Sequence, residues 1–452
     1  MKRRLAEETV LFISIIKWVT LAAIIGILSG FSTTYFLKLL AWSINKVTQY
    51  PYDFLLLPFA LFLSGLLIQY LAPEAEGQGT DRVIEAIHKH SGRIRPIVIP
   101  VKLVATVVTI AAGGSAGKIG PCAQIGGGLA SLFAEIFRFG DSDRKKLVIC
   151  GISAGFASVF GTPIAGAIFG VEVLFVGSVL YEVLLPSFVA GMVSFQVASS
   201  LGTTYFHNPI RFRPVFSESF MLEVVVAGIF FGICSFALVE TLRYGKRASD
   251  RIPGSLPWKG LMGGAMLIIL VLIFSRQFLG LGFETIQSAI LGKEIPWYAF
   301  FLKMVFTSIT LNFGGSGGIV VPILFIGSTA GSFYGSLIGE DPATFSSLGF
   351  AALLAGATNT PLASSILALE LFGGELAPYA ALSCIISFLM TGHRSVHATQ
   401  VLAIQKSASL RVKIGREVEE VEIAYQPREK SVISLLASFI QRLRNRKNRD
   451  RV

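Results

Sequence analysis

Two glycine-rich stretches of the sequence have the residue types to bind an anion through main-chain amides. Residues 113–126 read GGSAGKIGPCAQIG, and residues 314–327 read GGSGGIVVPILFIG. Clustered glycines disfavour a regular helix at the beginning of each stretch, whereas Pro121 is tolerated in the first turn of a new helix. Each stretch therefore predicts a helix that begins inside an apolar region, where free amides and the helix dipole favour an anion. The alternative is a glycine-rich kink at which helices pack.

The two stretches are copies of one motif. They agree at seven positions with one offset, 314 − 113 = 201. A Thr-Pro pair and a glutamate follow each copy at a second offset, 360 − 162 = 370 − 172 = 198. The matched positions are Gly113/Gly314, Gly114/Gly315, Ser115/Ser316, Gly117/Gly318, Pro121/Pro322, Ile125/Ile326, Gly126/Gly327, Thr162-Pro163/Thr360-Pro361 and Glu172/Glu370. These matches indicate an internal duplication with one broken helix in each half, and they favour the anion site over the packing kink.

The composition is typical of an all-α polytopic membrane protein. Hydrophobic residues make up 53% of the 452 residues, and charged residues make up only 15%. The chain contains roughly a dozen apolar stretches able to cross or enter a bilayer. The net charge of +11 comes from basic residues that lie mostly in short connections and tails. That distribution predicts cytoplasmic loops and two cytoplasmic termini, rather than a nucleic-acid partner.

Enzymatic and metal-dependent functions are not indicated. Four cysteines are dispersed in apolar stretches without metal-ligand spacing or a disulfide pattern. We find no set of nucleophile and base and no nucleotide-binding motif. We therefore expect no enzyme activity, no metal and no cofactor.

The duplication divides the chain into two membrane repeats that must position the glycine motifs. Unwound backbone survives inside a bilayer only where it is buried in protein or lines a polar cavity, so the two motifs should meet near the midplane and form one anion pathway. A short helix at residues 82–90 should be capped by Thr80 or Asp81, and a last short helix should follow Gln400. The expected parts are an interfacial segment at 1–10, the first repeat at 11–205, a loop at 206–217, the second repeat at 218–406 and a basic cytoplasmic tail at 407–452.

Four motifs in order resemble those of the CLC family of chloride channels and chloride/proton exchangers. The sequence GQGTD at 77–81 falls at the family's GSGIP, GKIGP at 117–121 at GREGP, and GIVVP at 318–322 at GxFxP. HRSVH at 393–397 falls where the family places a pore tyrosine. The resemblance implies an inverted, antiparallel repeat of many tilted and broken helices, and a homodimer with one pathway per subunit. It also implies a prokaryotic type whose tail lacks a regulatory domain of the CBS type.

The resemblance also assigns an anion site. Gln78 stands at the position of a family serine that donates a hydroxyl, and the pore tyrosine is replaced by His397 or, in a register one residue earlier, by Val396. A glutamine amide and a neutral imidazole can each still donate a hydrogen bond. The anion-binding residues that we expect are Gln78, Gly79, Lys118, Ile119, Gly120, Ile319, Val320 and His397.

Both carboxylates that carry protons in the exchangers are replaced. Ile119 stands at the family's gate glutamate, and Val173 stands at the inner proton glutamate. Glu172 matches a neighbouring glutamate with the repeat partner Glu370, which favours a structural role, although a carboxylate inside a membrane is also a functional candidate. Glu172 and His397 are thus the possible titratable groups, and the usual coupled exchange has no obvious route.

Two further expectations concern charge at the site. Asp81 should cap the short helix and face away from the pathway, because a carboxylate facing it would repel anions. A protonated His397 would bind an anion more tightly, so transport would rise on acidification. The alternative is that His397 only packs beside the pathway.

We predict passive, uncoupled transport of a chloride-type anion across a plasma membrane. Loss of an acidic plug leaves an anion pathway open unless bulk closes it, and Ile119 is bulky enough to act as a hydrophobic constriction. One alternative is proton-coupled antiport through Glu172 or His397. Another is a membrane protein that binds or senses an anion without transporting it. The expected partners are the anion, the lipid bilayer and a second copy of the chain, and the sequence leaves the preferred anion open.

Overall fold

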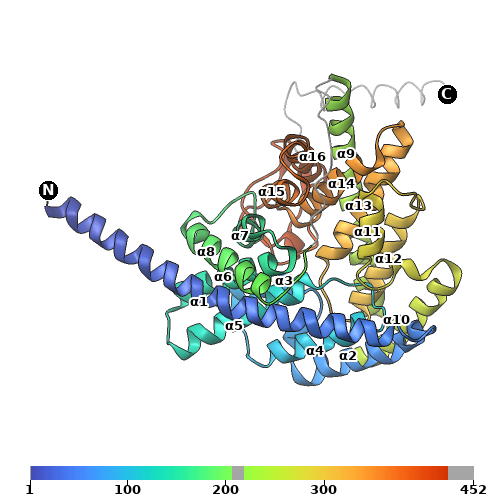
Figure 1. Ribbon diagram of the computed structural model, residues 1–452, viewed down its shortest axis with the longest axis horizontal. Helices are drawn as coiled ribbons and strands as arrows, with labels where there is room; N and C mark the ends of the chain where they lie inside the picture. The colour runs from blue at the N-terminus through green and yellow to red at the C-terminus, as the bar shows by residue number, and fades with distance from the viewer. Residues whose placement is uncertain (1, 206–217, 426–452) are drawn as a thin grey trace, which may run out of the picture.

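The computed structural model describes residues 2–205 and 218–425, which are mostly helical (Figure 1). The α-helices are α1 (Lys2–Val47), α2 (Leu57–Leu71), α3 (Gly79–Lys89), α4 (Val98–Ala111), α5 (Ile119–Ile136), α6 (Asp141–Phe160), α7 (Pro163–Glu172), α8 (Tyr181–Ser200), α9 (Glu218–Arg251), α10 (Leu256–Ile273), α11 (Phe283–Ile290), α12 (Ala299–Asn312), α13 (Val320–Ile338), α14 (Pro342–Thr358), α15 (Pro361–Phe372) and α16 (Ala377–Met390). The short strands are β1 (Phe175–Val176), β2 (Val401–Leu402), β3 (Leu410–Arg411) and β4 (Ala424–Tyr425). The loop expected at 206–217 and the tail beyond residue 425 lie outside the described residues.

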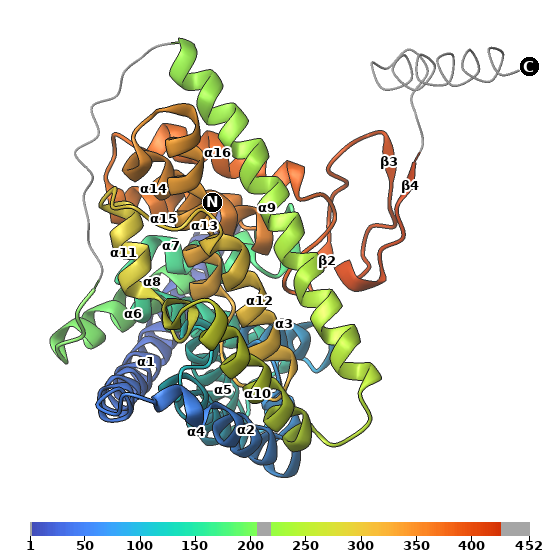
Figure 2. The ribbon, with the colours of Figure 1, turned by 90° about the vertical axis from the view of Figure 1, so that its right-hand side faces the viewer.

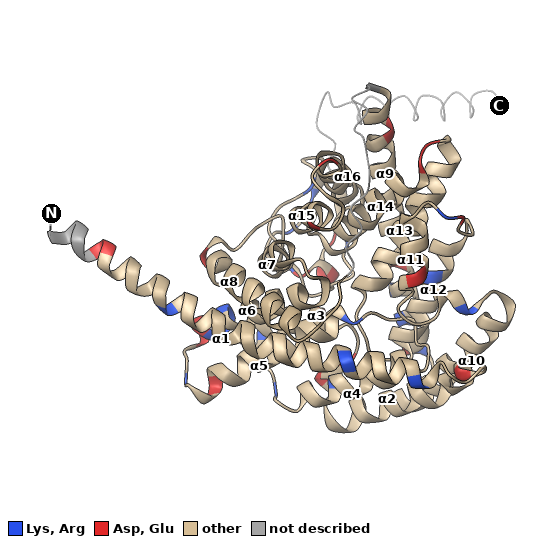
Figure 3. Ribbon diagram, in the orientation of Figure 1, with Lys and Arg blue, Asp and Glu red and all other residues tan. Residues whose placement is uncertain are grey.

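The helices combine full spans with shorter, partly spanning pieces. Six helices of the described chain are long and apolar enough to cross a membrane, and others, such as α7 and α15, are apolar but short. At 1.5 Å per residue, the 10 residues of α7 reach about 15 Å, half of a hydrocarbon core of about 30 Å. Charged residues are sparse along the helices (Figure 3). The chain is a multi-pass membrane protein of many tilted and broken helices, as predicted.

The two glycine motifs meet at a local two-fold axis. Gly117 and Gly318 form an antiparallel bridge, in which each N–H donates to the other's carbonyl oxygen at 2.7 and 2.6 Å. The main-chain N–H of Ser115 donates to Thr310 Oγ1 at 3.0 Å, and that of Ser316 donates to Thr109 Oγ1 at 3.0 Å. Because these bonds join repeat-related residues reciprocally, they confirm the internal duplication. Helices α5 and α13 start one offset apart (320 − 119 = 201).

Close helix packing explains several glycines of the core. A Cβ atom on Gly126 of α5 would lie 2.4 Å from the carbonyl oxygen of Gly151 in α6. In the second half, a Cβ atom on Gly327 of α13 would lie 2.2 Å from the carbonyl oxygen of Gly349 in α14. Such contacts are too short for any side chain, so the two helix pairs pack backbone to backbone. They hold the starts of α5 and α13 at the centre of the molecule.

The structure differs from the sequence-based expectations at three places. Helix α1 runs without a break from Lys2, so residues 2–10 are continuous with the first span. Helix α3 starts at Gly79 with Gln78 at its N-cap, earlier than predicted. The prediction of a last short helix after Gln400 was wrong, because Val401–Leu402 forms strand β2. This strand pairs in parallel with β1. Figure 2 shows this strand-bearing segment at one edge of the molecule.

Candidate functional site

Three helix starts converge at the two-fold axis. They are the N-termini of α3, α5 and α13, whose N-cap residues are Gln78, Lys118 and Ile319. A Cβ atom on Gly79 would lie 2.3 Å from the carbonyl oxygen of Gly120, and one on Gly318 would lie 2.6 Å from the nitrogen of Gly120. The three backbones therefore touch where only glycine fits. This places the free amides and positive dipole ends of three helices together.

None of these three starts has a side-chain cap within the described part of the chain. The sequence explains this, because lysine and isoleucine at the N-caps of α5 and α13 offer no acceptor, and Gln78 does not reach back to its own helix. By contrast, both carboxylate oxygens of Asp341 accept amides at the start of α14. The positive dipole ends of the three convergent starts thus have no side-chain cap within the described residues, which suits a negatively charged ligand.

The starts of α7 and α15 are closed by carboxylates from the opposite repeat. Glu172 at the end of α7 accepts the N–H groups of Leu362 and Ala363 at 3.0 and 2.8 Å. Glu370 of α15 likewise accepts the N–H groups of Ile164 and Ala165 at 3.1 and 2.8 Å. The exchange follows the two-fold symmetry and accounts for the repeated glutamate. It gives Glu172 a structural environment in which both of its oxygens are engaged.

Replacing Glu172 with glutamine is expected to lower stability by about 1–2 kcal/mol and to leave anion flux unchanged. A neutral amide has one acceptor oxygen instead of two and no charge to oppose the helix dipole. Thermal unfolding of the purified protein in detergent measures the loss, and Glu370→Gln should match it by symmetry. A variant with unchanged stability and altered proton movement would instead identify Glu172 as a proton carrier.

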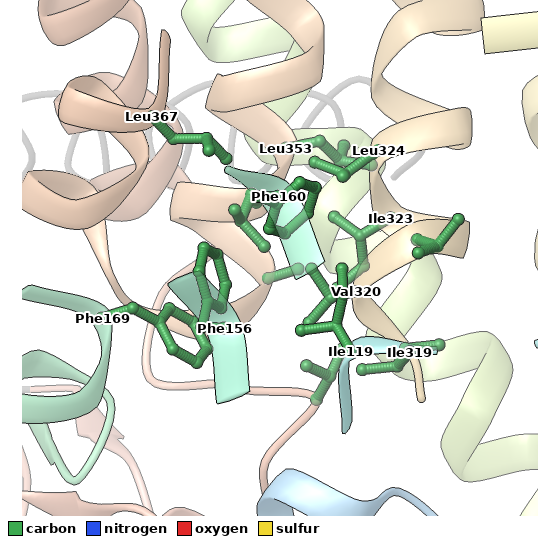
Figure 4. Packing of buried hydrophobic residues seen from close by; sticks show 14 of the residues in the cluster. Ile119, Phe156, Phe160, Phe169, Ile319, Val320, Ile323, Leu324, Leu353 and Leu367 are labelled. Carbon is green, nitrogen blue, oxygen red and sulfur yellow. The ribbon is translucent and has the colours of Figure 1, made fainter. Parts of the chain in front are cut away.

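An apolar seal lies at the convergent starts. Ile119, Ile319 and Val320 are 0%, 1% and 0% exposed and belong to one core cluster. Figure 4 shows Ile119 beside Ile319, with Val320 directly above them. The side chain at the start of α5 is therefore aliphatic and cannot titrate or imitate an anion.

Two cavities reach the convergent helix starts. The tail-side cavity, of about 320 Å³, is lined in part by Gly77, Gln78 and Val396. The far-side cavity, of about 260 Å³, is lined in part by Lys118 and Phe283. Residues 78 and 118 are the N-caps of two convergent helices, so each cavity reaches one of the convergent starts.

Each cavity offers a polar group without a partner in the described chain. Oε1 of Gln78 is buried and accepts no hydrogen bond. Since the two ends of an amide are assigned from their surroundings, the free end can equally be the donor. Lys118 has no ion pair within the described residues, and its ammonium lies 5.0 Å from the ring centroid of Phe283.

Val396 and His397 occupy different environments. Val396 lines the tail-side cavity together with Gln78, whereas His397 does not line it. The His397 side chain is fully buried, and neither ring nitrogen has a hydrogen-bond partner within the described residues. Burial lowers the pKa of this imidazole, which stands in the connection after α16, outside the spanning helices.

We expect the His397→Phe variant to keep the pH dependence of transport between about pH 5 and 8. With a lowered pKa in the folded state, the imidazole stays neutral over this range. In the unfolded chain the imidazole takes up a proton below its ordinary pKa of about 6.5, whereas in the folded chain it stays neutral. The contribution of His397 to the free energy of unfolding is therefore fully present above that pH and is lost as the pH falls. Liposome flux and thermal unfolding at several pH values test both points. If transport rose on acidification in the parent but not in the His397→Phe variant, this would contradict the expected pH dependence of transport.

The prediction that Asp81 caps the short helix and faces away from the pathway was wrong. Its carboxylate does not cap α3; Oδ1 accepts the main-chain N–H and the hydroxyl of Thr399 at 3.1 and 2.8 Å. The two residues are 318 positions apart, so no local pattern could have shown this contact. Asp81 also lines the tail-side cavity rather than facing away from it. The bonds tie α3 to the segment that follows α16.

Val173, which we expect at the family position of the inner proton glutamate, is fully buried. Its carbonyl oxygen accepts the Nε2–H of Gln400 at 2.7 Å, and the same amide donates to the carbonyl oxygen of Thr358 at 2.7 Å. The side chain at this position offers no proton acceptor.

Two buried lysines at repeat-related positions are functional candidates that were not predicted from the sequence. Lys102 donates through Nζ to the carbonyl oxygens of Ala75 and Gly77 at 3.0 and 2.6 Å. Lys303 donates to those of Phe278 and Gly280 at 3.0 and 2.9 Å. The positions obey the motif offset (303 − 102 = 201), which is the signal that could have found them. Lys102 fixes the loop immediately before Gln78.

The chain is similar in sequence to a known protein family. The family profile described as "Voltage gated chloride channel" matches residues 60–392. A "Chloride/fluoride channel protein" of Pseudomonas syringae pv. tomato is 35% identical over 407 residues, covering 88% of this chain and 89% of that protein. An "H(+)/Cl(-) exchange transporter ClcA" of Salmonella arizonae is 28% identical, covering 78% and 80% of the two chains.

Solved structures agree with this placement. The "Crystal structure of a CLC-type fluoride/proton antiporter" superposes with a TM-score of 0.81 at 28% identity, over 85% of this chain and 98% of that one. A eukaryotic CLC transporter shares the fold, with a TM-score of 0.69 over 86% of this chain and 74% of that one, at 16% identity. These relatives are channels and transporters rather than enzymes. The chain belongs to the voltage gated chloride channel (CLC) family of anion channels and transporters.

Proposed function

We propose that this protein conducts a small halide, chloride or fluoride, passively along the path from the tail-side cavity past Ile119 to the far-side cavity. The observation that carries the proposal is the contrast between helix starts. The starts of α7 and α15 are closed by Glu370 and Glu172, whereas the convergent starts of α3, α5 and α13 have no side-chain cap within the described residues. At the convergent starts a bound anion would supply the negative charge and the hydrogen-bond acceptors that the two carboxylates supply at α7 and α15.

The anion site consists mainly of backbone. The amides at residues 118–120, at 319–320 and at Gly79 face the anion, and the side-chain amide of Gln78 adds a donor. Lys118 attracts the anion from the far-side cavity. Of the two expected registers, we favour the one that puts Val396 rather than His397 at the position of the family's pore tyrosine, and its place on the same cavity as Gln78 supports this choice. The names of two relatives, a chloride/fluoride channel and a fluoride/proton antiporter, support both halides as substrates.

Uncoupled transport is supported by the aliphatic residues at the expected family positions and by the surroundings of the two titratable candidates. Ile119, Val173 and Val396 hold no proton, Glu172 is engaged by two amides, and the His397 ring is enclosed. Passage requires the apolar seal at Ile119 to open transiently, so we expect a modest rate.

Proton-coupled antiport is the second candidate. It is favoured by the buried carboxylate of Glu172 and by the superposition on a fluoride/proton antiporter. In that case Glu172 would have to release its two amide donors to carry a proton.

We further propose that the tail side of the membrane domain faces the cytoplasm and that the protein is a homodimer with one pathway per subunit. Basic residues such as Lys89, Arg243 and Lys246 line the tail-side cavity, which agrees with the preference of Lys and Arg for cytoplasmic loops. Exposed apolar side chains on α15, including Leu362 and Leu369, provide a surface for a second copy or for lipid.

Efflux from liposomes tests the transport proposal. Vesicles loaded with chloride or fluoride and containing the purified protein should release at least one of the two halides when valinomycin shunts the voltage, and protein-free vesicles should not. The absence of flux for both halides would contradict transport and would favour a binding or sensing role.

A further inference from the structure

A segment that follows the last helix folds back over the tail-side cavity. We call residues 401–425 the tail strap. It is anchored by β2, which pairs with β1, and by an antiparallel bridge between Val401 and Glu417. Val418 is buried in a small apolar cluster with Val176 and Leu402. The strap is therefore packed onto the membrane domain.

Main-chain bonds fix the register of the strap at the mouth of the cavity. The N–H of Val418 donates to the carbonyl oxygen of Gln400 at 2.8 Å, and that of Glu419 donates to the carbonyl oxygen of Ala398 at 3.2 Å. Glu417 immediately precedes a short 3-10 helix at Val418–Glu420, and Glu419 lies in that single turn. Both line the cavity into which Gln78 and Val396 also open.

These two glutamates meet the basic side chains of the cavity. Glu417 Oε1 lies 3.0 Å from Lys89 Nζ, and Glu419 Oε1 lies 3.8 Å from Lys246 Nζ. The basic residues that line the cavity are Arg82, Lys89, Arg243, Lys246 and Lys259. The acidic residues are Glu76, Asp81, Glu85, Asp250, Glu417 and Glu419. The formal balance is 5 − 6 = −1, and without the two strap glutamates it is 5 − 4 = +1.

We propose that Glu417 and Glu419 of the tail strap limit the entry of anions into the tail-side cavity by neutralising its basic rim. The inference rests on the proposed anion pathway, since an anion must cross this cavity to reach Gln78. Charges at the mouth of a cleft change the local concentration of a charged substrate and its rate of entry. Their effect is screened by salt, because the Debye length falls from about 30 Å at 0.01 M to about 3 Å at 1 M.

The double variant Glu417→Gln/Glu419→Gln tests this inference by flux. We expect anion flux about threefold or more above the parent at low ionic strength, and a difference below about twofold at 1 M salt. Glu420→Gln is the matched control, because Glu420 is adjacent, pairs with Arg416 at 3.7 Å and does not line the cavity. Glu419→Gln alone, at a side chain that is 60% exposed, changes charge without disturbing the packed part of the strap. An unchanged flux in both strap variants would overturn the inference.

A second readout does not depend on transport. Ala398 lines the cavity, and the four native cysteines are buried, so Ala398→Cys provides a reactive thiol at this place. The ratio of modification rates by an anionic and a neutral methanethiosulfonate reports the local potential. We expect this ratio to rise about threefold or more when the strap glutamates become glutamines, and to be insensitive to Glu420→Gln. An unchanged ratio would overturn the inference even in a protein that transports, whereas a raised ratio without halide flux would overturn only the proposed pathway.

Discussion

Replacing Ile119 with glutamate should lower anion flux at pH 7 by at least about tenfold and make the remaining flux rise on acidification. Residue 119 is the first residue of α5, beside the uncapped starts of α3 and α13. Glu172 and Glu370 show that carboxylates of this chain bind such helix starts. A carboxylate at residue 119 would therefore take the anion's place. A partly buried charge at one start is worth up to about 2 kcal/mol, and protonation would release it.

The flux of Ile119→Glu is best compared with that of Ile119→Gln. Glutamine has nearly the same size and polarity but no charge, so it should reduce flux much less and show no acid activation. Liposome efflux at several pH values measures both variants. Equal flux and equal pH profiles would contradict the placement of residue 119 at the anion site.

Replacing Lys102 with methionine should lower anion flux by about tenfold or more, with a loss of stability. The ammonium holds the carbonyl groups of Ala75 and Gly77, and thereby fixes the loop that carries Gln78 to the site. The methionine variant loses both bonds and a buried positive charge near the anion. Flux at a series of anion concentrations separates weaker binding from slower passage.

The internal duplication provides a matched control in Lys303→Met. Lys303 is equally buried and holds two carbonyl groups in the same way. Its loop precedes α11, and neither Phe278 nor Gly280 lines the tail-side cavity. We expect a similar loss in thermal stability and a change in flux below about threefold. Equal losses of flux in the two variants would show that Lys102 acts only through general stability.

Local signals accounted for the broken helices. Glycine runs and prolines predicted starts near residues 119 and 319, and α5 and α13 begin at Ile119 and Val320. The constant offset of 201 predicted the duplication, which the reciprocal bonds between Gly117 and Gly318 confirm. Such features are visible in sequence because glycine and proline act on the backbone at their own positions.

Contacts between distant segments were not predictable in this way. Asp81 was expected to cap its own helix, but its carboxylate binds Thr399. Residues after Gln400 were expected to be helical, but strand β2 is stabilised by pairing with β1, whose residue Phe175 faces Val401. In both cases a partner more than two hundred residues away overrides the local preference.

The structural role of Glu172 and Glu370 could be predicted from the sequence only in part. The offset of 198 between Glu172 and Glu370 suggested a structural role. It did not show that each glutamate closes a helix start of the other half. That exchange depends on how the two repeats pack, and within the described residues no side chain caps the convergent starts of α3, α5 and α13 in this way.

The central claim is that anions pass without protons, and simultaneous recording of anion efflux and external pH tests it most directly. Liposomes containing the purified protein are loaded with chloride or fluoride and diluted into a solution without that anion. We expect efflux that requires valinomycin and is unaccompanied by proton movement. Protons driven uphill by the anion gradient would contradict it and would direct attention to Glu172.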